Sequence, residues 1–176
     1  MAQAIEDFDV VIVGGGIVGL SAACVLAPMV KRIALVNQSP ASAWSAGSDY
    51  GLRVTAVNLA SQKLLAEIGV WKDIQQMRCT PYHDMVVWQS LSDAEVHFSA
   101  NMTGHTSLGA IVENNVLVQA LTLRLKTLTN VSCYEPSSMQ NFSELSDNSV
   151  LIELENAEGQ SQRLTSRLLI GTDGVH

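Results

Sequence analysis

The chain has 176 residues, of which 47% are hydrophobic and 15% charged, and a length of this order fits about one domain with a substantial core. Its net charge of −7 and the absence of any basic run exclude a broad nucleic-acid-binding surface. The widely spaced Cys24, Cys79 and Cys133 indicate neither a disulfide framework nor a zinc site, and the acidic N-terminus lacks the basic start of a signal peptide, so we expect an intracellular protein.

The first predicted element is an apolar strand at Val10–Val13, which runs directly into the motif Gly-x-Gly-x-x-Gly and a helix of small residues. In this order the glycines suit a dinucleotide pyrophosphate. Gly14 allows the tight turn after the strand, Gly16 lets the backbone approach the phosphates, and Gly19 lets the helix pack closely on the strand. The helix N-terminus offers free N–H groups to the anion. The segment therefore predicts a dinucleotide-binding unit.

The same region permits a second interpretation, because residues 10–30 are uncharged and about 20 residues can span a bilayer. Successive glycines would weaken such a helix by about 1 kcal/mol each relative to alanine, and Pro28 would interrupt it. The β-branched residues at 10–13 suit a buried parallel strand better. We favour a strand followed by a helix that ends at Pro28, and a second strand at Ile33–Val36 completes a βαβ unit.

Further elements follow in chain order. Residues 38–52 are rich in Ser, Ala, Gly and Pro and predict a loop. From Thr55 onward the apolar spacing predicts a helix that ends at Gly69, with its buried face formed by Val57, Ala60, Leu64 and Ile68. A short helical segment from Trp71 to Met77 comes next. Residues 83–89 and 95–99 predict an antiparallel hairpin.

A second long helix is predicted to start at Asn114 or Asn115, either of which can cap it, and to bury Leu117, Leu121, Leu125 and Leu128. Residues 131–134 predict a third parallel strand. Residues 150–155 and 163–170 predict a hairpin around a turn at 156–159. The last of these strands runs into a glycine-rich turn at 171–174, which is typical of a ligand-binding loop at the carboxyl end of a sheet.

Five segments together resemble the flavin-dependent aromatic hydroxylases, in particular the ubiquinone-biosynthesis branch that includes the octaprenylphenol hydroxylases: Asp9–Leu20, Leu52–Val57, Leu64–Trp71, Leu108–Asn114 and Leu169–Gly174. The resemblance implies an α/β fold, a Rossmann-like FAD-binding domain of the GR2/PHBH type with a parallel sheet and antiparallel hairpin insertions. It also implies that residues 1–176 are the N-terminal FAD-binding part of a longer enzyme. Residues 80–110 would begin the substrate-side sheet, and the rest of that sheet would follow His176.

The resemblance also implies the roles of individual residues. Gly14, Gly16 and Gly19 would hold the FAD pyrophosphate, Arg53 and Asn114 would lie near the FAD phosphates, and Asp173 and Gly174 would lie near the pyrophosphate and the route of NAD(P)H. Asn37 departs from the family pattern, because a glutamate normally stands there and accepts hydrogen bonds from the adenosine ribose. A neutral amide forms a weaker bond, about 1 kcal/mol against about 1.5–3 for a charged acceptor. We therefore expect a weakened ribose contact.

In the implied reaction, NAD(P)H reduces FAD and O₂ supplies the oxygen atom that is transferred to the ring of a polyprenylated phenol. The sequence contains no catalytic triad and no metal-ligand spacing, which fits a reaction carried out by a cofactor. A lipid-dwelling substrate implies a cytoplasmic protein that associates peripherally with the inner membrane or with a ubiquinone-biosynthesis complex. Two alternatives stay open at this point. One is an NAD(P)-dependent Rossmann oxidoreductase, which Asn37 favours slightly, and the other is a non-catalytic protein on the FAD fold that binds lipidated partners.

Overall fold

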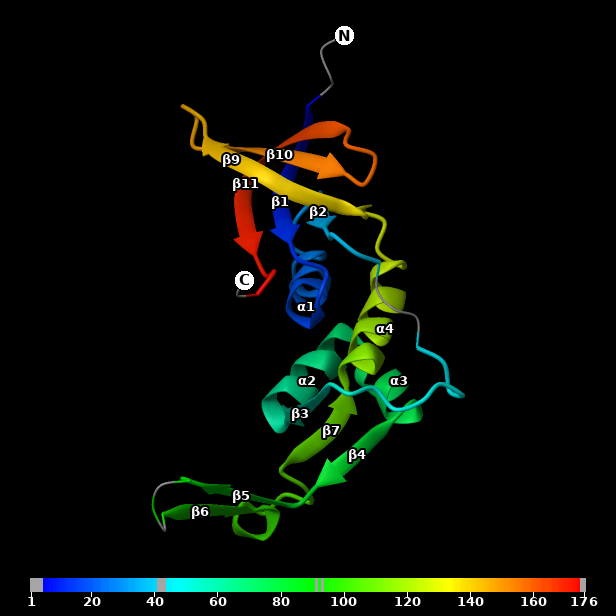
Figure 1. Cartoon of the computed structure of the whole chain (residues 1–176), viewed down its shortest axis with the longest axis vertical. Helices are drawn as coiled ribbons and strands as arrows, with labels where there is room; N and C mark the ends of the chain where they lie inside the picture. The colour runs from blue at the N-terminus through cyan, green and yellow to red at the C-terminus, as the bar shows by residue number, and fades with distance from the viewer. Residues whose placement is uncertain (1–4, 41–43, 91, 93, 175–176) are drawn as a thin grey trace. The chain divides into compact units, whose positions relative to one another are not determined.

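The computed structural model describes residues 5–40, 44–90, 92 and 94–174. The chain divides into two compact units, one made of Met1–Ala43 with Val118–His176 and the other of Trp44–Leu117 (Figure 1). Its elements are β1 (Glu6–Val13), α1 (Ile17–Leu26), β2 (Ile33–Val36), β3 (Val54–Asn58), α2 (Leu59–Ile68), α3 (Trp71–Gln76), β4 (Cys79–Tyr82), β5 (Asp84–Trp88), β6 (Glu95–Ser99), the 3₁₀ turn η1 (Ala100–Met102), β7 (Gly109–Glu113), α4 (Asn114–Leu125), β8 (Val131–Tyr134), β9 (Ser137–Glu144), β10 (Val150–Asn156) and β11 (Ser161–Gly171).

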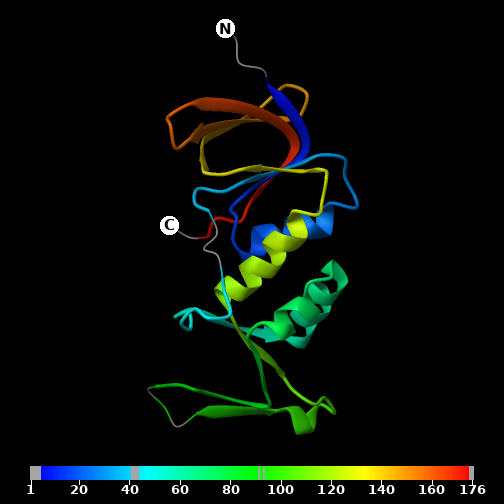
Figure 2. The same cartoon turned by 90° about the vertical axis from the view of Figure 1, so that its right-hand side faces the viewer.

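The first unit is built around a six-stranded sheet with the strand order β8-β2-β1-β11-β10-β9. β1 pairs in parallel with both β2 and β11, and β2 pairs in parallel with β8. β9, β10 and β11 pair in antiparallel fashion. Figure 2 shows the strong curvature of this sheet in its blue, yellow and orange strands. The structure thus confirms the predicted βαβ unit, the third parallel strand and the hairpin of β10 and β11.

Buried side chains from four strands form the core of this unit: Phe8, Val11, Val13, Ala34, Val36, Ile152, Leu154 and Leu164. All residues of Val10–Val13 and Ile33–Val36 are buried, as expected for parallel strands that are covered on both faces. In the register of the sheet, Val13 lies opposite Gly171. The glycine motif after β1 and the turn after β11 therefore follow the carboxyl ends of two neighbouring parallel strands and lie side by side.

The long uncharged segment at 10–30 is divided between β1, α1 and the turn that follows. Helix α1 has 10 residues and ends at Leu26, before Pro28. Among the helices in the described ranges, none has both the length and the apolar character needed to cross a membrane. The predicted strand and helix are confirmed, and the membrane-spanning interpretation of this segment is not supported.

The second unit contains an antiparallel sheet of three strands, β3-β7-β4, and the separate hairpin of β5 and β6. Helix α2 starts after Asn58, whose side chain accepts a hydrogen bond from the Ser61 N–H at 2.8 Å. It ends at Gly69, where φ is 93°, so the predicted glycine C-cap is confirmed. Both views show the β5–β6 hairpin at the end of this unit that lies away from α2 and α3 (Figures 1 and 2).

The predicted start of helix α2 at Thr55 is wrong. Residues 54–58 form β3, which pairs with β7, and α2 begins only at Leu59. The predicted buried face is also partly wrong, since Leu64 has an exposed fraction of 42% and Leu65 one of 5%. The spacing of apolar residues across the β3–α2 junction imitates one continuous helix. Pairing with a distant strand and the cap at Asn58 decide the conformation instead.

The sequence patterns also predict no strand at β4, β7 or β9. Strand β9 is an edge strand with the sequence SSMQNFSE, in which polar residues dominate and most of the second half is exposed. Strand β7 is short and leads directly into α4. Neither pattern shows the regular alternation by which a half-buried strand is recognised in a sequence.

A carboxylate in the middle of β1 fastens this strand to the segment before β2. Asp9 Oδ2 accepts hydrogen bonds from the backbone N–H groups of Lys31 and Arg32 at 2.8 and 2.9 Å, and its Oδ1 lies 3.5 Å from Nη2 of Arg167. The backbone bond from Arg32, then that from Lys31, and the nearby Arg167 charge lower the pKa of Asp9 below its usual value. The charged form is therefore favoured by folding.

We expect Asp9→Asn to lower the urea midpoint of unfolding at pH 7. A carboxyl with a lowered pKa in the folded state contributes stability above its unfolded pKa of about 3.9, and that contribution is lost as the pH falls through the folded value. The difference between the two proteins should therefore shrink in an unfolding series carried from pH 7 to pH 3. A difference that is independent of pH would show that the charge of Asp9 is not involved.

Candidate dinucleotide-binding site

The glycine motif begins with a turn that only glycine can make here. Gly14 donates its N–H to the Val36 carbonyl at 2.8 Å and has φ at +116°. A Cβ at this position would lie 2.6 Å from the carbonyl carbon of Thr172 and 2.7 Å from the nitrogen of Asp173. The predicted role of Gly14 in the tight turn after β1 agrees with this geometry.

Gly19 lies where helix α1 approaches the turn most closely. A Cβ there would overlap the carbonyl oxygen of Gly14 and would stand 2.6 Å from Thr172 Oγ1. That hydroxyl lies 2.9 Å from the Val13 carbonyl and 3.0 Å from the Gly14 carbonyl, to which it donates. Thr172 thus fastens the turn from the neighbouring strand. The sequence pattern does not predict this role, although Thr172 lies within the predicted glycine-rich turn at 171–174.

Gly16, in contrast, faces open space, since a Cβ there would meet no atom within 4 Å. It is the N-cap of α1, and this helix end has no side-chain cap and no acidic residue in its first turn. The first N–H groups of a helix lack partners within the helix and attract anions. Because Gly16 carries no side chain, an anion can come close to these donors.

A groove of about 310 Å³ opens beside this helix end. Four of the residues predicted to bind the cofactor line it, namely Gly14, Gly16, Asn37 and Asp173, together with Val13, Gly15, Val36, Gln38, Ser39, Ser137, Met139 and Thr172. Gly174 directly follows Asp173 in the chain. Gly19 does not line the groove but packs against the Gly14 carbonyl of the turn. An open backbone cradle with a free helix N-terminus fits the pyrophosphate of a dinucleotide.

Asn37 follows β2 and contacts the glycine turn directly. Its Oδ1 accepts a hydrogen bond from the Gly15 N–H at 3.3 Å, and its Nδ2 donates to the Ser39 carbonyl at 2.5 Å. A Cβ on Gly15 would lie only 2.8 Å from Cβ of Asn37, so the middle glycine is needed as well. The sequence motif predicts no role for Gly15, because the requirement for glycine there comes from a residue 22 positions away.

The remaining two predicted residues, Arg53 and Asn114, belong to the second unit and are joined through their backbones. The Asn114 N–H donates to the Arg53 carbonyl at 3.0 Å. The Thr55 hydroxyl donates to Asn114 Oδ1 at 2.6 Å, which leaves both N–H groups of the amide for other acceptors. Arg53 is exposed, and within the described part of the chain no hydrogen bond of its guanidinium is found. Asn114 is the first residue of α4, as predicted.

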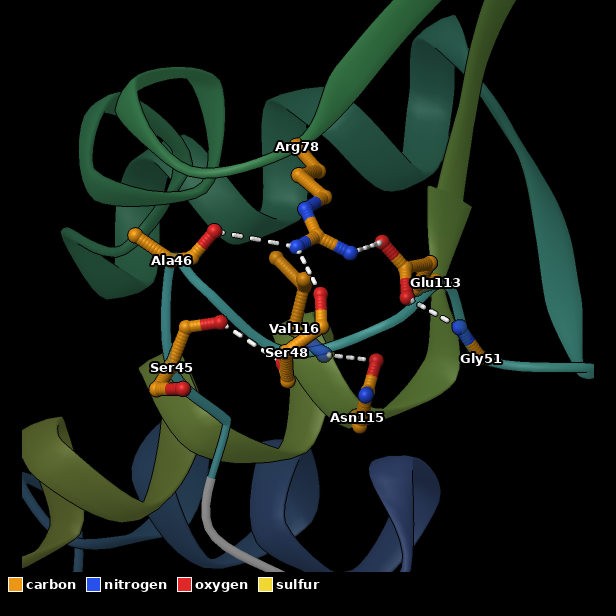
Figure 3. Close-up of polar contacts among 8 residues, drawn as sticks. All are labelled: Ser45, Ala46, Ser48, Gly51, Arg78, Glu113, Asn115 and Val116. Carbon is orange, nitrogen blue, oxygen red and sulfur yellow. Dashed lines mark hydrogen bonds and ion pairs between the residues drawn. The ribbon is translucent and has the colours of Figure 1, made fainter.

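A second arginine, Arg78, is far more strongly fixed (Figure 3). Its Nη1 donates to Glu113 Oε1 at 3.3 Å, and its Nη2 donates to the carbonyl of Ala46 at 3.1 Å and also to that of Ser48. The guanidinium lies 4.4 Å from the ring centre of Tyr50. The sequence patterns do not predict this cluster, for which the one visible signal is a glutamate directly after the apolar run of β7.

The FAD binding domain family matches residues 7–176 of this chain. The chain belongs to this family. The match includes the glycine motif, the β3 and β7 segments, and the turn after β11, so the FAD-binding domain expected from the resemblance is confirmed. A simple nicotinamide-binding Rossmann protein is correspondingly disfavoured.

The chain is also similar in sequence to individual curated enzymes. The chain is 33% identical over 178 residues to the mitochondrial ubiquinone biosynthesis monooxygenase COQ6 of Rattus norvegicus, covering 95% of this chain and 37% of the relative. It is 34% identical over 171 residues to the 3-demethoxyubiquinol 3-hydroxylase of Escherichia coli strain K12, covering 97% and 42%. The chain thus spans about two fifths of the length of these relatives. Both relatives are named as ubiquinone-biosynthesis or demethoxyubiquinol-hydroxylating enzymes, the class of relatives that the sequence resemblance implies.

Solved structures confirm the fold. The flavin-dependent monooxygenase PieE, solved in complex with FAD and substrate, matches with a TM-score of 0.76 at 19% identity, over 98% of this chain and 31% of that protein. The p-nitrophenol 4-monooxygenase PnpA from Pseudomonas putida DLL-E4 matches with a TM-score of 0.71 at 19% identity, over 96% and 41%. The mixed sheet with antiparallel additions is therefore an architecture shared with flavin monooxygenases.

Proposed function

We propose that this chain forms the FAD-binding part of an NAD(P)H- and O₂-dependent monooxygenase that hydroxylates a polyprenylated phenol. The observation that carries the proposal is the open helix end at Gly16 beside a turn held by Thr172. This arrangement supports dinucleotide binding. The hydroxylation is supported by the names of the relatives, which are a ubiquinone biosynthesis monooxygenase and a demethoxyubiquinol hydroxylase.

In this proposal, two groups of residues bind the cofactor. In the first unit they are Gly14, Gly16, Gly19, Asn37, Asp173 and Gly174, and in the second they are Arg53 and Asn114. The N–H groups at the start of α1 receive the pyrophosphate, and the guanidinium of Arg53 suits phosphate oxygens. Thr55 holds the amide oxygen of Asn114, so the two N–H groups of that amide stay available for a phosphate oxygen.

When bound, FAD supplies the redox chemistry that no side chain of the chain can supply. The chain's own contribution is to bind and to orient. In the proposal, the turn at 14–16 contacts the FAD pyrophosphate, Asn37 contacts the adenosine ribose, and Asp173 lies on the path of NAD(P)H. We name no catalytic residue among these side chains.

We also propose that residues 80–110 belong to the substrate-side sheet. In the β5–β6 hairpin the pairs Met85 with Phe98 and Val87 with Val96 lie on one face, and all four side chains are at least 40% exposed. An apolar face of this kind suits the tail of a polyprenylated substrate. Such a substrate lives in lipid, so we propose that the protein acts in the cytoplasm, at the surface of the inner membrane or in a ubiquinone-biosynthesis complex.

The test is FAD uptake by the purified protein. We expect the visible spectrum of a flavoprotein after incubation with FAD and gel filtration, and no comparable retention of NAD⁺ or NADP⁺. A protein that stays colourless would contradict the proposal, and retention of NADP⁺ alone would favour the nicotinamide alternative. Oxidation of NAD(P)H that depends on an added polyprenylated phenol, with formation of its hydroxylated product, tests the reaction itself.

Replacing Asn37 with glutamate is expected to tighten FAD binding about 3- to 10-fold. A charged acceptor strengthens a hydrogen bond by on the order of 1 kcal/mol relative to a neutral one, and 1.4 kcal/mol corresponds to tenfold. The dissociation constant from flavin fluorescence titration checks this expectation. An unchanged or larger constant would show that Asn37 serves the Gly15 turn alone. Asn37→Ala, which removes both contacts, is the matched control and should weaken binding.

A further inference from the structure

The segment that leads to Arg53 is held by side-chain contacts. In the part that the structure describes, residues 44–53 form no helix or strand. Arg78, just before β4, instead donates to the carbonyls of Ala46 and Ser48 (Figure 3). Its guanidinium also stacks on the ring of Tyr50. One guanidinium therefore fastens three residues of this segment.

Glu113 at the end of β7 fastens the same segment from the other side. Its Oε1 accepts from Arg78 at 3.3 Å, and its Oε2 accepts from the Gly51 N–H at 2.5 Å. Glu113 is 4% exposed, and its two described partners leave neither carboxylate oxygen unpaired. A buried carboxylate is costly unless it is paired in this way.

Both ends of this arrangement lead directly to the proposed cofactor residues. Gly51 lies two residues before Arg53, and Glu113 immediately precedes Asn114. The Arg53 carbonyl in turn accepts the Asn114 N–H. We propose that the ion pair of Arg78 and Glu113 is a positioning device that holds Arg53 and Asn114 in their FAD-binding arrangement. This inference rests on the proposed function, since it names the residues that pre-organise that site.

The chemistry of the pair explains why it uses these residue types. The planar guanidinium directs separate N–H groups at a carboxylate and at two carbonyls while its face covers an aromatic ring. A lysine ammonium is a compact charge and cannot do all of this in one geometry. Lysine at position 78 should therefore restore only part of the effect.

The experiment compares Glu113→Gln, Arg78→Lys and the double variant Arg78→Met/Glu113→Gln with the original protein. The double variant leaves no unpaired buried charge, so it is expected to fold even where Arg78→Met alone does not. Arg163→Met is the matched control, because Arg163 pairs with Glu153 at 3.0 Å but both side chains are much more exposed. Circular dichroism verifies the fold of each variant.

Two measurements separate the loosening of residues 44–53 from the loss of FAD affinity. Arg53 is the only lysine or arginine between Arg32 and Lys63, so tryptic cleavage after it reports on this segment in FAD-free protein. We expect Glu113→Gln and the double variant to be cleaved about 10-fold faster than the original protein and to bind FAD about 10-fold more weakly. Arg78→Lys should lie between these variants and the original protein in both measurements. Arg163→Met should behave like the original protein. Unchanged cleavage, or faster cleavage with unchanged FAD affinity, would overturn the proposal.

A double-mutant cycle shows whether the pair acts in part through Arg53. In an Arg53→Ala background, Glu113→Gln should weaken FAD binding by clearly less than its roughly 10-fold effect in the original protein, because one of the two side chains that it positions is already absent. Purely additive effects would mean that the pair only supports the fold, and would overturn the proposal. If the original protein takes up no FAD, the proposed function fails, and the cleavage rates still decide whether the pair holds the segment.

Discussion

Gly19→Ala is expected to destabilise the protein by about 3 kcal/mol, the upper range for overpacking a tight contact. Alanine favours helices by about 1 kcal/mol over glycine, so a surface position in α1 would gain stability from this change. Here the methyl group would overlap the Gly14 carbonyl and press on the Thr172 hydroxyl. The helix would have to move away from the turn, and FAD binding should be lost with it.

Urea unfolding with and without FAD measures both effects. Gly16→Ala is the matched control for stability, since the same methyl group added three residues earlier meets no atom within 4 Å. Equal unfolding midpoints for the original protein and Gly19→Ala would contradict the close contact between α1 and the turn.

Gly16→Ala is expected to weaken cofactor binding strongly while the fold stays intact. Its methyl group would point into open space in the free protein, and its backbone has φ at −79°, which alanine adopts without strain. In the complex it would occupy the place of the pyrophosphate. We expect the FAD dissociation constant to rise by on the order of 100-fold, or about 2.8 kcal/mol.

Fluorescence titration with FAD, together with an unfolding curve, checks this prediction. Gly47→Ala is the control, because a Cβ there also meets no atom within 4 Å and Gly47 lies outside the glycine turn. FAD affinity close to that of the original protein would show that Gly16 does not face the phosphates, and the proposed site would have to be placed elsewhere.

Local patterns in the sequence were sufficient for the βαβ unit and its glycine turn. An uninterrupted apolar strand, three glycines at fixed spacing and a proline after the helix all act over a few residues. The family resemblance added Arg53 and Asn114, whose backbone contact the structure contains.

The features that the sequence did not predict depend on contacts between distant residues. Thr55 lies in a strand because it pairs with Val112, and its hydroxyl reaches a side chain 59 residues away. Arg78 meets Glu113 across 35 residues, and Thr172 meets Gly14 across 158. Periodicity cannot report such pairs, because each partner stands in a segment that looks ordinary by itself.

The Thr172 contact has a consequence for the order of folding. β1 is hydrogen-bonded on one side to β2 and on the other to β11, whose paired residues come 158 positions later in the chain. During synthesis, the N-terminal βαβ segment must wait with one edge unpaired until β11 has left the ribosome. Pairings of such high contact order form slowly. The glycine turn at 14–16 is therefore the first motif to be translated and one of the last to reach its final shape.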